Sequence, residues 1–300
     1  MKILLLGQKG LLSSRIYDYF FKLDNFDIKS ISLRDKETLE RFVKNDISNI
    51  ILDADLIINA IGLNNVECES SRDLADFFYD FLPTKLIKFS NKYKIRYFQF
   101  SSIHSVNYAL KKNIIILPKD IEPKTTYGYY HNNLERLFLS HINEFKYASI
   151  IRLTNSIGPP LTLNYKKEHW ISICNKINFQ LFNKEKIIIK DPNLFKTFIP
   201  ISLVLKNLEI LSKSSNRKPV YQFVTDYKIS LYNLYQIFSK YFVLYESQKS
   251  KLDSYVERKL FEYFIYDRVF NDLEYCNKES YFKEFISELK YTYHILKNIL

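Results

Sequence analysis

The chain begins with the stretch MKILLLGQKGLLSSRIYDYF, residues 1–20, in which an apolar run meets two glycines and then a helical pattern. The run Lys2–Leu6 is typical of a strand that is buried on both faces of a parallel sheet. From Leu11 onward, apolar residues recur at helical spacing. A strand that passes through the Gly7–Gly10 turn into a helix directs backbone N–H groups and the helix dipole at one place. Such a place is a favourable binding site for a pyrophosphate.

The glycine turn is an incomplete form of the three-glycine dinucleotide motif, because Ser13 stands where the last glycine is expected. Serine is small enough to allow close packing of the helix on the strand. Ser13 and Ser14 are also candidate caps of the helix. Two interpretations stay open for these residues: a dinucleotide-binding turn, or an ordinary strand–helix unit that holds no ligand.

Composition is that of a globular protein, with 47% hydrophobic residues and a net charge of +11 over 300 residues. This length suits one large α/β domain or a domain with an appended lobe. The basic residues are scattered and accompany no nucleic-acid motif, so we expect a solvated surface and no nucleic-acid partner. A positive field would also attract anionic nucleotides or a membrane face.

Segments that signal a location are not expected either. No apolar run is long enough to span a bilayer, and polar residues interrupt the first apolar stretch too early for a signal peptide. Cys68, Cys174 and Cys276 are odd in number and lack metal-ligand spacing. We therefore expect reduced thiols in a cytoplasmic protein, no membrane insertion and no metal site.

Strands and helices alternate along the first two thirds of the chain. Further strands are predicted at 27–33, 55–62, 96–100, 147–153, 186–190 and 220–224, with an extended segment at 195–200. Helices are predicted at 36–47, 74–93, from Thr125 onward, at 170–182, from a cap at Ser230 to Phe242, and within 253–300. This alternation predicts an α/β fold with a Rossmann-like, doubly wound parallel sheet and a smaller, mostly helical C-terminal lobe. We expect residues 1–165 and 196–228 to form the nucleotide-binding domain, and residues 166–195 and 229–300 to form the substrate lobe.

Candidate binding residues follow the carboxyl ends of the predicted strands, where such folds bind ligands. Arg34 would tolerate the 2′-phosphate of NADP, while the neighbouring Asp35 keeps NAD open. The small-residue turn Asn59–Gly62 would let the backbone approach a cofactor closely. Ser101 and Ser102 end the strand at 96–100.

A helix near Thr125 carries Tyr127, His131 and Glu135 at intervals of four residues, so the three share one face. We expect Glu135 to be structural. For Tyr127 and His131, packing is the alternative to a role in catalysis.

With these residues in order, the chain resembles the extended short-chain dehydrogenase/reductase family, the NAD-dependent epimerase/dehydratase group that acts on nucleotide sugars. The resemblance covers roughly Lys2 to Val224. The matching segments are the Gly7/Gly10 turn, Asn59–Gly62, Ser101–His104, Tyr127–Glu135, Arg152–Pro159 and Lys196–Phe198.

The resemblance implies that Tyr127 is a general acid/base and that Ser102 hydrogen-bonds the substrate oxygen. An ungapped alignment on Val106 would instead place the serine position on Ile103. His131 stands where the family has a lysine that lowers the pKa of the tyrosine and holds the nicotinamide ribose. A Tyr-x-x-x-His version is associated with a subgroup found near surface-polysaccharide genes. Asp80 is a second departure, since the family usually has an asparagine there.

Further roles follow from the same resemblance. The cofactor, NAD or NADP, would contact Gly7, Gly10, Leu11, Leu12, Arg34, Asn59, Ala60, Gly62, Ser101 and His131. The nucleotide sugar would contact Ser102, Tyr127, Asn155 and Lys196, where Lys196 replaces a typical arginine and loses its bidentate fork on phosphate. Apolar helix faces at 74–93 and 127–139 would permit a homodimer.

Two functions are therefore compared. The first is a cytosolic NAD(P)-dependent nucleotide-sugar epimerase, reductase or dehydratase that supplies a precursor for a bacterial surface glycan. The second is a degenerate relative that binds NAD(P) or a nucleotide sugar without turnover, as a sensor or assembly partner. The substitution at His131, the uncertain serine and Ser13 favour the second.

Overall fold

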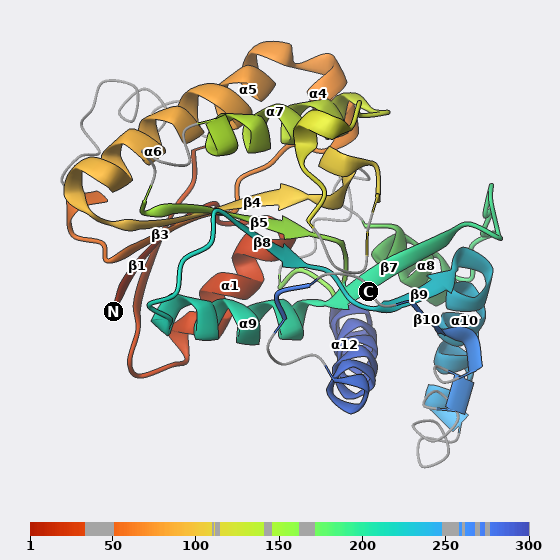
Figure 1. The fold of residues 1–300 in the computed structure, drawn as a ribbon. Coiled ribbons are helices and arrows are strands. Elements are labelled where there is room, and N and C mark those ends of the chain that lie inside the picture. The colour runs from red at the N-terminus through yellow and green to blue at the C-terminus, as the bar shows by residue number, and fades with distance from the viewer. Residues whose placement is uncertain are drawn as a thin grey trace. The chain divides into compact units, whose positions relative to one another are not determined.

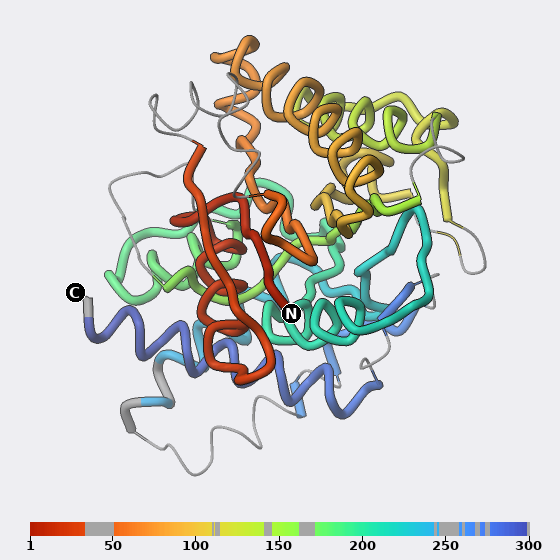
Figure 2. The backbone as a smooth tube through the Cα atoms, turned by 90° about the vertical axis from the view of Figure 1, so that its left-hand side faces the viewer, coloured from red at the N-terminus to blue at the C-terminus, as the bar shows by residue number. Residues whose placement is uncertain are grey.

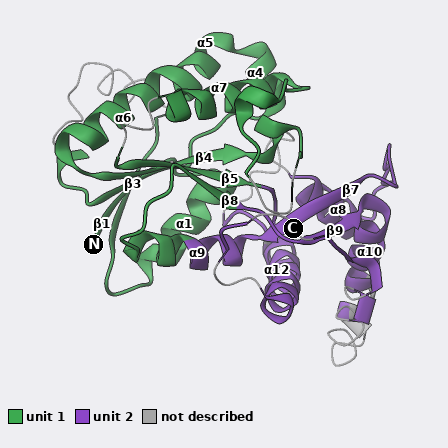
Figure 3. Cartoon of the chain, in the orientation of Figure 1, with its two compact units in different colours: residues 1–153, 208–222 green, residues 154–207, 223–300 purple. Residues whose placement is uncertain are grey.

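The computed structural model describes residues 1–33, 51–109, 111, 115–140, 146–161, 172–247, 258–259, 262–267, 271–273 and 277–299. The chain forms two compact units (Figure 3). Unit 1 comprises residues 1–153 and 208–222, and unit 2 comprises residues 154–207 and 223–300.

Unit 1 is built on a sheet of six strands among the described residues (Figure 1). The strands are β1 (Lys2–Leu6), β2 (Asp27–Ile31), β3 (Leu56–Asn59), β4 (Arg96–Ser102), β5 (Ala148–Leu153) and β8 (Val220–Phe223). Their spatial order is β2-β1-β3-β4-β5-β8, and the pairs from β2 to β5 are parallel. The chain moves from β1 to β2 on one side and then to β3 on the other, so the strand order reverses between β1 and β3. The carboxyl ends of β1 and β3 therefore form the topological switch point.

Helices cover both faces of this sheet, which confirms the predicted Rossmann-like, doubly wound fold. One face carries α4 (Asn65–Ser70), α5 (Arg72–Asp76), a π-turn (Phe77–Phe81), α6 (Leu82–Tyr93) and α7 (Thr126–Ser140) (Figure 1). The other face carries α1 (Leu11–Phe21) and the end of α9 (Ile201–Lys213). Tyr19 of α1 donates a hydrogen bond to Glu209 of α9 at 2.6 Å. Figure 2 shows β1, α1 and β2, all in red, lying side by side.

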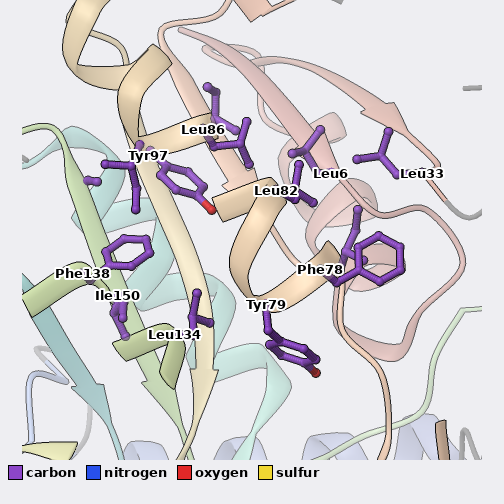
Figure 4. Packing of buried hydrophobic residues seen from close by; sticks show 14 of the residues in the cluster. Leu6, Leu33, Phe78, Tyr79, Leu82, Leu86, Tyr97, Leu134, Phe138 and Ile150 are labelled. Carbon is purple, nitrogen blue, oxygen red and sulfur yellow. The ribbon is translucent and has the colours of Figure 1, made fainter. Parts of the chain in front are cut away.

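Apolar side chains fill the space between the sheet and the α5–α7 layer (Figure 4). Leu6 and Tyr97 come from the strands, while Phe78, Leu82 and Leu134 come from the helices. Each of these side chains is almost completely buried. Burial of a large apolar side chain stabilises the fold by roughly 1.5–3 kcal/mol, so this layer holds α7 against the sheet.

Three local predictions differ from the structure. Helix α1 begins at Leu11 with Gly10 as its cap, so Ser13 and Ser14 lie inside the first turn rather than before it. The predicted helix 74–93 contains the π-turn at 77–81. Residues 186–190 form no strand, although they are described. By contrast, Ser230 does cap α10 (Leu231–Ser247), because its Oγ accepts from the Asn233 N–H at 3.2 Å.

Among its described residues, unit 2 contains a four-stranded sheet that the sequence pattern predicted only in part. Its strands, in the order β10-β9-β7-β6, are β10 (Ile265–Tyr266), β9 (Tyr227–Ser230), β7 (Phe195–Pro200) and β6 (Asn155–Ile157). Unit 2 also carries α8 (Ile173–Phe182), α10, α12 (Lys278–Ile299) and the first residues of α9. The helical C-terminal part agrees with prediction.

No helix in the described part of the chain is both long enough and apolar enough to cross a membrane.

Candidate active site

The glycine turn after β1 brings the backbone close to both α1 and β3. Gly7 has φ +113°, a conformation that strains any residue with a side chain. A Cβ at Gly7 would lie 3.1 Å from the Cβ of Ser13 and 3.5 Å from the carbonyl carbon of Ala60. Ser13 Oγ accepts from the Gly10 N–H at 3.0 Å, so the serine closes the turn from inside the helix. Leu11 and Leu12 then lie in the first helical turn, where backbone N–H groups have no intrahelical acceptor.

The turn after β3 lies beside this glycine turn at the switch point. Ala60 N–H donates to the Leu6 carbonyl at 3.0 Å, and Asn59 Oδ1 accepts from the Ile61 N–H at 3.1 Å. The Asn59 amide also donates to Gln99 Oε1 of β4 at 2.8 Å. Because the side chain is used within the fold and the whole residue is buried, the amide of Asn59 has a structural role in this turn.

Tyr127, Ser102 and two imidazoles gather where β4 ends. The Tyr127 ring makes edge-on contacts with His131, at 4.4 Å between centroids, and with His104, at 5.3 Å. Ser102 Oγ accepts from the His104 N–H at 3.3 Å and also interacts with the Tyr127 phenol. Ser102 thus places its hydroxyl beside Tyr127, while Ile103, the other alternative, is buried in the core.

Close backbone packing fixes the start of α7 against this cluster. A Cβ at Gly128 would lie 2.8 Å from the His104 carbonyl oxygen, nearer than atoms can approach. Thr125 Oγ1 accepts from the Gly128 N–H at 3.0 Å and caps the helix. The glycine therefore allows the contact that holds Tyr127 next to the end of β4.

A buried polar network lies directly behind His131. Glu135 forms an ion pair with Arg152, whose Nη2 is 2.5 Å from Oε2, and both side chains are fully buried. Glu135 Oε1 accepts from Ser101 and from Ser105, each at 2.7 Å. Ser101 Oγ is also 3.3 Å from His131 Nδ1. Glu135 therefore has a structural role, as expected: it joins β4, α7 and β5 through buried polar contacts. The sequence did not reveal that Arg152 and Ser105 are its partners.

Burial sets the protonation states of the two central residues. It lowers the pKa of His131 to about 3, and the nearby His104 acts in the same direction. Burial raises the pKa of Tyr127 to about 12, against a smaller opposite effect of the Ser102 hydroxyl. At neutral pH the imidazole is therefore uncharged and the phenol keeps its proton.

Tyr79 is a further residue of this cluster that the sequence did not reveal. Its ring contacts His131 edge-on at 4.8 Å, and its hydroxyl accepts from Leu63 N–H at 3.0 Å and donates to the Leu63 carbonyl at 3.1 Å. It lies in the π-turn, which adds one residue to the helical register. Asp80, the residue singled out by the resemblance, is exposed instead.

The two predicted substrate residues of unit 2 lie on neighbouring strands. Asn155 on β6 pairs with Phe198 on β7, two residues beyond Lys196, and its amide donates to the Thr197 carbonyl at 3.0 Å. Burial lowers the pKa of the Lys196 ammonium. Arg34, Asp35 and the predicted helix 36–47 lie outside the described residues.

Within unit 1, the fold thus gathers the predicted residues into two groups. Gly7, Gly10, Leu11, Leu12, Asn59, Ala60 and Gly62 lie in the turns after β1 and β3 or at the start of α1. Ser101, Ser102, Tyr127 and His131 form the cluster at the end of β4.

Comparisons with known proteins were made at three levels. No protein-family model matches the sequence, and no curated protein does either. Solved structures do match. The UDP-glucuronic acid 4-epimerase of Bacillus cereus, in complex with UDP-glucuronic acid and NAD, has a TM-score of 0.70 at 13% identity, covering 98% of this chain and 100% of that one.

Two further structures extend this likeness. The UDP-N-acetylglucosamine 4-epimerase of Methanobrevibacter ruminantium M1 has a TM-score of 0.71 at 15% identity, with 98% of both chains covered. The capsular polysaccharide assembling protein CapF of Staphylococcus aureus has a TM-score of 0.59 at 18% identity, covering 88% of this chain and 64% of that one. At these identities the likeness shows the fold, which is that of NAD-dependent nucleotide-sugar epimerases and dehydratases.

Proposed function

We propose that this chain is an NAD(P)-dependent enzyme that acts on a nucleotide sugar as an epimerase, reductase or dehydratase. The observation that carries the proposal is the cluster at the end of β4, where the Tyr127 phenol lies beside the Ser102 hydroxyl and the His131 ring. Carboxyl ends of parallel strands are where open α/β sheets bind ligands.

The residues at the switch point fit a dinucleotide. Gly7 lets the turn after β1 approach Ser13 and Ala60 closely, and the first turn of α1 offers N–H groups and a positive dipole end to a pyrophosphate. Gly7, Gly10, Leu11 and Leu12 would hold the diphosphate, and the Asn59–Gly62 backbone would lie along the cofactor. Arg34 is proposed to determine whether the site prefers NAD or NADP.

The proposed chemistry assigns each polar side chain one task. A bound nicotinamide supplies hydride exchange with a carbon of the sugar. Ser102 orients the sugar hydroxyl, and Tyr127 donates or accepts its proton. His131 and Ser101 hold the cofactor ribose, while Asn155 and Lys196 are proposed to contact the diphosphate of the substrate.

The likeness to CapF supports a role in surface-polysaccharide synthesis, because that protein is described as assembling capsular polysaccharide. We place the reaction in the cytoplasm, where the thiols of Cys68 and Cys174 stay reduced. We further propose a homodimer that covers Phe81 and Tyr129, which are exposed on the α5–α7 layer. Sedimentation analysis would test the homodimer.

A second candidate function is binding without turnover. It is favoured by the protonation states of the cluster, since an uncharged His131 cannot lower the pKa of Tyr127 as a lysine would. Such a protein would bind NAD(P) or a nucleotide sugar as a sensor or assembly partner.

The first test is thermal stabilisation by NAD, NADH, NADP and NADPH, each added separately. A ligand at 100 times its dissociation constant stabilises the folded state by about 2.7 kcal/mol. A clear shift with one redox pair supports the dinucleotide site and justifies assays with nucleotide sugars. If none of the four shifts the transition, the proposed cofactor is wrong.

Tyr127→Phe separates the two candidates once a ligand is known. Turnover should collapse in the enzyme, whereas binding should persist in a non-catalytic protein. Tyr129→Phe is the matched control, because Tyr129 lies on the same helix but is 53% exposed. Full turnover in Tyr127→Phe would show that another group transfers the proton.

A further inference from the structure

The hydrogen bonds around Ser101 allow only one arrangement of protons. Glu135 lies in a buried ion pair with Arg152, with contacts of 3.1 Å from Nε to Oε1 and 2.5 Å from Nη2 to Oε2. A carboxylate in such a pair carries no proton and can only accept hydrogen bonds. The remaining charged nitrogen of Arg152, Nη1, donates to Gln222 at 2.9 Å, so the network is internally satisfied.

The Ser101 hydroxyl has a single proton, which must point at Glu135. The oxygens of Ser101 and Glu135 are 2.7 Å apart, and without a proton between them this contact would be repulsive. Toward His131, Ser101 Oγ therefore presents a lone pair. The imidazole nitrogen Nδ1, 3.3 Å away, must supply the proton of that hydrogen bond.

We propose that Glu135 is a positioning residue that acts through Ser101 to hold His131 as the neutral Nδ1–H tautomer, leaving Nε2 as a hydrogen-bond acceptor. The group that binds at Nε2 must then donate, as a ribose or sugar hydroxyl can. A lysine at this position would donate instead, so the substitution reverses the direction of the hydrogen bond. That the donor is a ribose hydroxyl rests on the proposed function, whereas the tautomer does not.

The surroundings of His131 are consistent with an uncharged ring. The side chain is 6% exposed, and the groups around it are the Tyr79 and Tyr127 rings, His104 and the Ser101–Glu135 pair. The charge of Glu135 is already matched by Arg152. Protonation of Nε2 would thus create a buried cation, and the neighbouring anion is already paired. For this reason burial lowers the pKa of His131.

The test is nitrogen NMR of the ligand-free protein labelled at its five histidines. Long-range couplings from the ring protons distinguish a protonated from an unprotonated ring nitrogen, and His131→Gln identifies the His131 signals. We expect Nδ1 protonated and Nε2 unprotonated at neutral pH. In Ser101→Ala the acceptor for Nδ1–H is lost, so we expect the Nδ1–H form to fall to a minority.

Ser105→Ala is the matched control. Ser105 donates to the same Glu135 oxygen at the same 2.7 Å distance, whereas it is the Ser101 hydroxyl that faces His131 Nδ1. Both variants remove one donor from Glu135, so a merely structural effect would appear in both. We expect the wild-type tautomer to persist in Ser105→Ala.

Three results would overturn the inference: Nε2–H in the wild type, a doubly protonated ring at neutral pH, or an identical tautomer in Ser101→Ala and wild type. If Ser101→Ala does not fold, the wild-type spectrum alone decides the tautomer. Failure of every nicotinamide dinucleotide to bind would remove the proposed function but leave the tautomer result standing. Binding of one of them with the wrong tautomer would remove this inference alone.

Discussion

The neutral state of His131 should make the folded protein lose stability as the pH falls. An unfolded histidine binds a proton below about pH 6.5, whereas burial lowers the pKa of folded His131 to about 3. Between these values the unfolded state holds more protons, so stability rises with pH and is lost on acidification. From about pH 7.5 to about pH 5, the unfolded state gains about 2 kcal/mol from this one residue, calculated with about 1.36 kcal/mol per pKa unit.

The size of this effect hardly depends on the folded pKa, provided that the value lies well below 5. The assay is urea unfolding of the wild type and His131→Gln at both pH values, in the same buffer and salt. We expect the wild type to lose about 2 kcal/mol more than the variant on acidification. His294→Gln is the control, because it removes an exposed histidine far along the chain from His131. Equal losses in the wild type and His131→Gln would refute the conclusion that burial keeps this ring neutral.

Three further substitutions test the packing around the site. Gly128→Ala would bring a Cβ to 2.8 Å from the His104 carbonyl oxygen, so we expect urea unfolding to show a loss of about 1–3 kcal/mol; a gain of about 1 kcal/mol, as in an unhindered helix, would contradict this contact. Arg152→Met leaves the buried Glu135 without its cation and should cost about 3–5 kcal/mol or prevent folding; a loss below about 1 kcal/mol would show that the pair is not desolvated. Gly7→Ala must adopt φ +113°, and we expect weaker thermal stabilisation by the dinucleotide that stabilises the wild type, whereas an unchanged shift would place the cofactor elsewhere.

Much of the fold was predictable because apolar residues follow one another in buried parallel strands but recur every three to four residues in amphipathic helices. The runs that became β1 and β3 are continuous apolar segments followed by small or polar residues, whereas those that became β4 and β5 carry Gln99 and Arg152 among their apolar residues. The predicted caps failed for a different reason. Ser13 was interpreted as preceding a helix, but Gly10 can begin the helix because Ser13 Oγ accepts from its N–H. A glycine cap whose N–H is bonded by the side chain of the third helical residue has no distinctive sequence pattern.

The site was less predictable, because it depends on contacts between distant segments. The four-residue spacing placed Tyr127, His131 and Glu135 on one face, and the structure joins the last two through Ser101. The spacing could not show that Arg152 would reach Glu135 from β5. Nor could it show the π-turn, which shifts the helical register by one residue so that Tyr79 contacts His131 while Asp80 faces solvent.

His131 therefore does not act as a weaker source of the positive charge that a lysine would supply at this position. An ammonium group there would be buried next to Glu135, whose charge Arg152 already neutralises, and burial without a counter-charge is costly. Under the proposed function, a positive charge that arrives with the ligand would lower the pKa of Tyr127. The oxidised nicotinamide ring is cationic and the reduced ring is neutral. Tyr127 would then release its proton only when the cofactor is ready to accept hydride, and keep it when the cofactor is reduced. Withdrawing a proton accompanies oxidation of a sugar alcohol and supplying one accompanies reduction, so a neutral His131 is compatible with catalysis in both directions.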